Sequence, residues 1–65
     1  MIQVHIRNAF AITRAAGLTP QAIYASIYRV APTVTMTQVF NALTRMYNEH
    51  SAILRGGVVF LQPPN

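Results

Sequence analysis

The sequence contains no cysteine, no lysine and no tryptophan, and its only acidic residue is Glu49. Without cysteine, neither a disulfide nor a thiolate metal site can stabilise the chain. A lone carboxylate cannot form an acid/base pair, and the sequence has neither an activated nucleophile pattern nor a glycine-rich phosphate loop. His5 and His50 are far apart in the chain and belong to no ligand cluster. We therefore expect no enzymatic activity, no metal and no cofactor.

Long apolar runs are also lacking: none approaches the roughly 20 residues needed to span a bilayer. We therefore expect a cytoplasmic protein that does not enter a membrane. The 65 residues, 52% of them hydrophobic, form a single domain over 1–65. A chain this small buries only about 60% of the surface that its unfolded form exposes. The apolar surplus predicts a dimer interface or a groove for a partner protein.

All of the positive charge comes from five arginines, which give a formal net charge of +4. A basic balance suits nucleic acid, an acidic protein or a membrane surface. Guanidinium groups bind phosphates and guanine edges in a bidentate manner, which an ammonium group cannot do. The charge alone leaves these partner classes open.

Turn-forming segments divide the chain into three helix-sized pieces and a hairpin. The segments are "GLTP" (17–20), "APTVT" (31–35), "NEHS" (48–51) and "RGG" (55–57). The first piece predicts a helix over 2–16, and Gly17 is expected to end it in the left-handed conformation. Residues 2–6 also alternate like a strand, so the first turn is ambiguous.

The second and third helices carry clear start signals. Thr19 is expected to cap the second helix, with Pro20 at its first position, and Pro32 predicts its end near Ala31. For the third helix, Thr35 and Gln38 form a capping box. Its core face consists of apolar residues at helical spacing, namely Val39, Leu43, Met46 and Tyr47. The other tyrosines, Tyr24 and Tyr28, are also expected to pack on the core.

Two β-prone runs, 52–55 and 58–62, are joined by Gly56-Gly57 and predict a hairpin. Glycine accepts positive φ at both central positions of a type I′ turn. The resulting register pairs Arg55 with Val58, Leu54 with Val59 and Ile53 with Phe60. Both faces of this hairpin are apolar, and we expect one of them to supply a dimer interface.

These pieces together resemble the winged helix-turn-helix superfamily. "TPQAIYASI" resembles its second helix, "VTMTQVFNALTRM" its recognition helix and "AILRGGVVFLQ" its wing. The resemblance implies a mainly α fold with a C-terminal β-hairpin, that is, three helices plus a short wing. By its small size, the chain also resembles the stand-alone regulators of phages and plasmids. The glycine that commonly follows the recognition helix is absent, and residues 48–51 stand in its place.

The polar face of the third helix suits DNA reading. A major groove about 12 Å wide admits one helix, in which Gln38 and Asn41 can bind adenine and Arg45 guanine or phosphate. We expect helix 35–48 in the major groove and the 55–58 wing on the phosphate backbone. The candidate DNA-binding residues are Thr35, Thr37, Gln38, Asn41, Thr44, Arg45 and Arg55. Alternatively, the face is ordinary solvated helix surface, and Arg55 protects an edge strand from pairing.

Two functional hypotheses follow. The first is a sequence-specific regulator that binds double-stranded DNA as a homodimer, because a twofold partner doubles the few contacts of one small module. The second is a winged-helix module that binds and modulates a partner protein, which the low charge density favours. An exposed surface shared by Arg45, Arg55 and the Gln38/Asn41 edge would favour DNA, whereas an apolar surface would favour protein.

Overall fold

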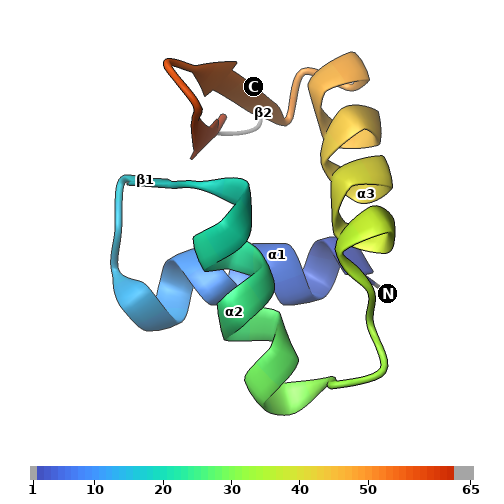
Figure 1. The fold of residues 1–65 in the computed structure, drawn as a ribbon. Helices are drawn as coiled ribbons and strands as arrows, with labels where there is room; N and C mark the ends of the chain where they lie inside the picture. Colours follow the sequence, from blue (N-terminus) through green and yellow to red (C-terminus); the bar gives the residue numbers. More distant parts are fainter. Residues whose placement is uncertain (1, 63–65) are drawn as a thin grey trace.

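The computed structural model describes residues 2–62, which form three helices and a small antiparallel sheet (Figure 1). The elements in chain order are α1 (Ile2–Thr13), β1 (Gly17–Leu18), α2 (Pro20–Val30), α3 (Met36–Asn48), β2 (Ala52–Arg55) and β3 (Val58–Leu61). The expected mainly helical fold with a C-terminal hairpin is confirmed. None of the helices within residues 2–62 has the length and apolar content needed to cross a membrane.

The predicted starts of α2 and α3 are confirmed by their capping hydrogen bonds. Thr19 Oγ1 accepts a hydrogen bond from the backbone N–H of Ala22 at 3.1 Å. Thr35 Oγ1 accepts from the N–H of Gln38 at 3.1 Å, and Gln38 Oε1 accepts from the N–H of Thr35 at 2.8 Å. This reciprocal pair is the predicted capping box. Because these bonds satisfy N–H groups that lack helical partners, both helices begin where the local sequence indicates.

The predicted end of the first helix is wrong. The α1 helix stops at Thr13 rather than Ala16, and Arg14, with φ of 55°, takes the left-handed conformation expected of Gly17. Thr13 Oγ1 donates to the carbonyl of Ala9 at 2.8 Å in the last turn. Gly17 instead lies in β1, opposite Phe60. Its lack of a side chain serves close packing against the sheet rather than helix termination.

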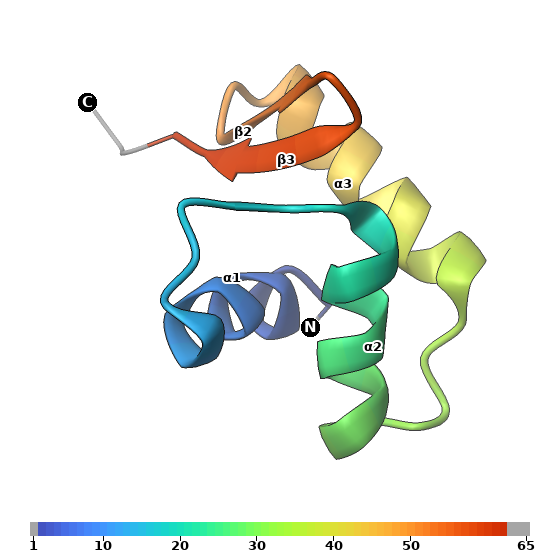
Figure 2. The same ribbon diagram turned by 60° about the vertical axis from the view of Figure 1, so that its left-hand side comes forward.

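The sheet has the strand order β1-β3-β2, and all of its pairs are antiparallel (Figure 2). The hairpin register is the predicted one, with Arg55 opposite Val58 and Ile53 opposite Phe60. Gly56 and Gly57 both have positive φ, at 59° and 78°, as a type I′ turn requires. The two-residue strand β1 was not predicted, and it extends the hairpin to three strands.

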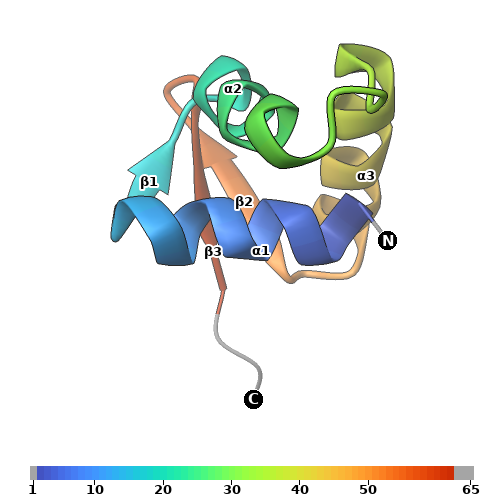
Figure 3. The same cartoon turned by 90° about the horizontal axis from the view of Figure 1, so that it is seen from below.

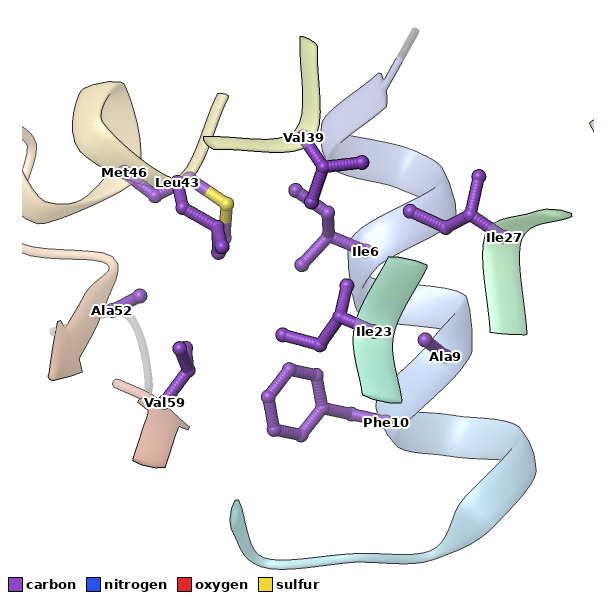
Figure 4. Close-up of a cluster of buried hydrophobic side chains, with 10 residues drawn as sticks. All are labelled: Ile6, Ala9, Phe10, Ile23, Ile27, Val39, Leu43, Met46, Ala52 and Val59. Atoms are coloured by element: carbon purple, nitrogen blue, oxygen red, sulfur yellow. The ribbon is translucent and has the colours of Figure 1, made fainter. Parts of the chain in front are cut away.

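The core lies where the three helices and the inner face of the sheet meet (Figure 4). Burying each of its large aliphatic side chains contributes about 1.5–3 kcal/mol. The buried residues are Ile6, Ala9, Phe10, Ile23, Ile27, Val39, Leu43, Met46, Ala52 and Val59. All three helices and the hairpin therefore depend on one another for burial.

Tyr24 and Tyr47 pack against the core, as expected. The expectation was wrong for Tyr28, which is 54% exposed. The buried stripe of α2 consists of Ile23 and Ile27, and Tyr28 follows Ile27 by about 100° around the helix, which turns it toward solvent. The rings of Tyr24 and Tyr28 pack on each other instead, with centroids 6.0 Å apart.

The hairpin is apolar on both faces, as expected, but the core covers part of one face. Ala52 and Val59 lie on the inner face and are buried in the core. The opposite face carries Ile53, Val58 and Phe60, which are half-buried. Leu54, which shares the inner face because side chains alternate along a strand, is 53% exposed, so the core covers this face only in part.

Candidate nucleic-acid interface

The side of α3 that faces away from the core carries polar side chains, all of them exposed. They are Thr37, Gln38, Asn41, Thr44, Arg45 and Asn48. The opposite side of the helix is the buried stripe of Val39, Leu43 and Met46. Arg45 is the only charged residue of the helix, so its outward face is positive and free of acids. The structure therefore brings the predicted α3 residues together on one accessible surface.

Internal hydrogen bonds limit what some of these side chains can offer. The Oε1 atom of Gln38 is engaged in the capping box, which leaves its NH₂ group as the free donor. Thr35 Oγ1 accepts in the same motif, and Thr44 Oγ1 donates to the carbonyl of Phe40 at 3.0 Å. Bidentate recognition of adenine needs both the oxygen and the nitrogen of an amide. Asn41, whose side chain makes no hydrogen bond within residues 2–62, keeps both.

A shallow cavity of about 280 Å³ opens on this surface. It forms where the N-terminal end of α1 lies beside α3 (Figure 3). The described residues that line it are Ile2, Gln3, Gln38, Asn41, Ala42 and Arg45. Gln3 was not among the predicted site residues, because nothing local in the sequence places the start of α1 next to α3.

Arg55 lies apart from this cavity, on the hairpin. It is the last residue of β2, exposed, and next to the Gly56-Gly57 turn. By strand alternation its side chain belongs to the outer face, with Ile53. Thr35 and Thr37 lie at the N-terminal end of α3, where free backbone N–H groups favour anions, and neither lines the cavity.

The remaining arginines, Arg7, Arg14 and Arg29, are also exposed. One glutamate cannot neutralise five guanidinium groups, so the surface stays positive. Burial raises the pKa of the Tyr47 phenol above its ordinary value. Among residues 2–62 there is no cluster of three histidines or acids that could hold a metal ion.

Comparisons of the chain with models of protein families, with curated proteins and with solved structures found no match.

Proposed function

We propose that this protein is a small winged helix-turn-helix regulator that binds double-stranded DNA in a sequence-specific manner. In this proposal α3 enters the major groove and the turn between β2 and β3 contacts the phosphate backbone. The element order supports it, since three helices followed by a hairpin are the minimal arrangement of a winged helix-turn-helix. The pairing of β1 with β3 adds support, because it ties the hairpin to the start of α2.

The observation that carries the proposal is the composition of the exposed face of α3. It combines amides, hydroxyls and one arginine with no acid. These are the groups that donate to and accept from base edges and phosphates. A face that served only to be solvated would have no reason to exclude glutamate, which is a good helix former.

The proposed contacts fall into two classes. Asn41 reads a base, and Arg45 binds guanine or a phosphate. Thr35, Thr37 and Arg55 contact phosphates and fix the orientation of the domain, while Gln38 and Thr44 add single hydrogen bonds. This division follows from the hydrogen bonds already made within the chain, in which the amide oxygen of Gln38 accepts from the N–H of Thr35.

The DNA-binding form is proposed to be a homodimer. Two copies related by a twofold axis would present two α3 helices to successive turns of the duplex. The outer face of the hairpin, with Ile53, Val58 and Phe60, offers the apolar surface for this contact. The dimer is expected to form at micromolar concentration.

The alternative function is a winged-helix module that binds a partner protein. It is favoured by the same apolar hairpin face and by Phe40 on α3, which is 44% exposed. Aromatic anchors of this kind are enriched at protein interfaces. In this alternative the arginines contact an acidic surface rather than phosphates.

A mobility-shift assay on random duplex at two salt concentrations tests the proposal. We expect binding at low salt that weakens steeply as salt rises, because phosphate contacts release counterions. Circular dichroism on the same sample verifies that the helices are intact. A folded protein that shifts no duplex at low salt would contradict DNA binding and favour the protein-binding alternative.

A further inference from the structure

The cavity between α1 and α3 combines an apolar wall with polar side chains. Ile2 and Ala42 supply the apolar part, while Gln3, Gln38, Asn41 and Arg45 supply the polar part. Ligand pockets in proteins usually enclose about 300–1,000 Å³. At about 280 Å³ the cavity fits a compact molecule of single-ring size.

The polar groups of the cavity are biased toward donors. Arg45 has only donors, and Gln38 has its oxygen engaged by the N–H of Thr35, so it presents its NH₂ group. No acid lies among the described lining residues, and the chain's only carboxyl side chain, on Glu49, is elsewhere. Such a set of groups attracts an anion that accepts hydrogen bonds and repels a cation.

We propose that this cavity binds a small carboxylate carried on an apolar body. The carboxylate accepts hydrogen bonds from the guanidinium of Arg45, which matches it in a bidentate geometry. The amide of Asn41 lies on the same lining and can donate to the same group. The apolar body of the ligand rests against Ile2 and Ala42, where it displaces water from apolar surface.

Ligand binding at this position has a consequence for the interface. The ligand occupies Gln38, Asn41 and Arg45, three of the side chains proposed to contact DNA. A bound carboxylate therefore competes with duplex DNA and acts as a releasing effector. The competition rests on the proposed function, whereas binding of the carboxylate does not.

Benzoate is a simple probe of this chemistry, and benzamide is its neutral counterpart of the same shape. In a ¹⁵N-resolved NMR titration, benzoate should give saturable shifts of the side-chain amides of Gln3, Gln38 and Asn41 and of Nε of Arg45. Benzamide should bind at least about tenfold more weakly than benzoate, since it lacks the charge-assisted hydrogen bond. Absence of benzoate-induced shifts at millimolar concentration, or equal binding of benzamide, would overturn the proposal.

Two arginine variants with the same net charge distinguish binding at this site from a general attraction of anions to the protein. Arg45→Gln should weaken benzoate binding about tenfold, whereas Arg29→Gln, on α2 and outside the cavity, should leave it unchanged. Ala42→Leu should also abolish binding by filling the cavity without altering charge. Equal losses in the two arginine variants, or wild-type affinity in a folded Ala42→Leu protein, would count against the site.

The competition is measured by adding benzoate to a preformed complex with a labelled duplex. We expect benzoate to release DNA from the wild type, and benzamide at the same concentration to release none. A protein that binds benzoate but no DNA would support the cavity and contradict the proposed function. DNA binding that persists at saturating benzoate would overturn the effector role.

Discussion

Gly17 in β1 lies directly opposite Phe60 in β3, and the Phe60 ring covers the place where a side chain at position 17 would lie. A Cβ atom built on Gly17 would be 2.7 Å from Cε2 of Phe60 and 2.6 Å from Cγ1 of Val58. Packing of an aromatic ring over a glycine on the neighbouring strand fixes the register of short strands. This contact joins the segment before α2 to the hairpin.

Gly17→Ala should therefore lower the free energy of unfolding by about 1–3 kcal/mol, the usual cost of overpacking. Urea denaturation measures the change. In a Phe60→Leu background the ring is absent, so the same substitution should cost less. An equal cost in both backgrounds would show that the strain does not come from the ring.

The capping box of α3 predicts a loss of about 1 kcal/mol for Thr35→Ala, because the N–H of Gln38 loses its acceptor. Thr37→Ala is the matched control. Thr37 is exposed on the same helix, and its hydroxyl makes no hydrogen bond within residues 2–62, so the expected change is within about 0.5 kcal/mol. Thermal unfolding of the two variants compares them directly, and similar midpoints would contradict the role of the box.

Arg14 occupies a conformation that suits glycine better, with φ of 55°. Arg14→Gly should raise the free energy of unfolding by about 1 kcal/mol, since the left-handed region costs a residue with a Cβ about that much. Arg7→Gly removes the same charge from the interior of α1 and should lower the free energy of unfolding by about 1 kcal/mol. Opposite signs in urea denaturation are expected. A loss of stability in both variants would show that the Arg14 side chain makes a stabilising contact.

The proposed division of DNA contacts predicts different behaviour for Arg55 and Asn41. Arg55→Ala should weaken binding about equally on all duplexes and reduce the salt slope by roughly 1 per monomer, because a phosphate contact is lost. Asn41→Ala should cost about 1–3 kcal/mol on the preferred site and little on random DNA. Fluorescence anisotropy at several salt concentrations distinguishes the two. Unchanged affinity and salt slope in a folded Arg55→Ala protein would indicate that this arginine only protects an edge strand from pairing.

The outer face of the hairpin predicts self-association. Sedimentation equilibrium at micromolar concentration should show a species of twice the 7.2 kDa chain mass. Ile53→Lys places a charge on that face and should restore the monomer, while Val4→Lys, at an exposed position of α1, should not. A wild-type protein that stays monomeric, or dissociation by both substitutions, would contradict the proposed interface.

The local sequence predicted the starts of two helices and the turn of the hairpin, because their signals lie between residues close in the chain. Thr19 and Pro20 start α2, Thr35 and Gln38 start α3, and the Gly56-Gly57 turn sets the hairpin register. In each case the signal and its hydrogen-bond or turn partner are at most a few residues apart. The same holds for the polar face of α3, which follows from helical periodicity alone.

Contacts between segments distant in the chain were decided by the tertiary structure. Gly17-Leu18 form a strand only because β3 is present to pair with them, and two residues carry no periodicity of their own. Gly17 lies in this strand, and the left-handed residues are instead Arg14 after α1 and His50 after α3. The cavity likewise exists because the start of α1 lies beside α3, which places Gln3 on the same lining as Asn41 and Arg45. Sequence patterns report interactions within one element, whereas these features depend on how elements pack, and packing is set by the combined shape of the core.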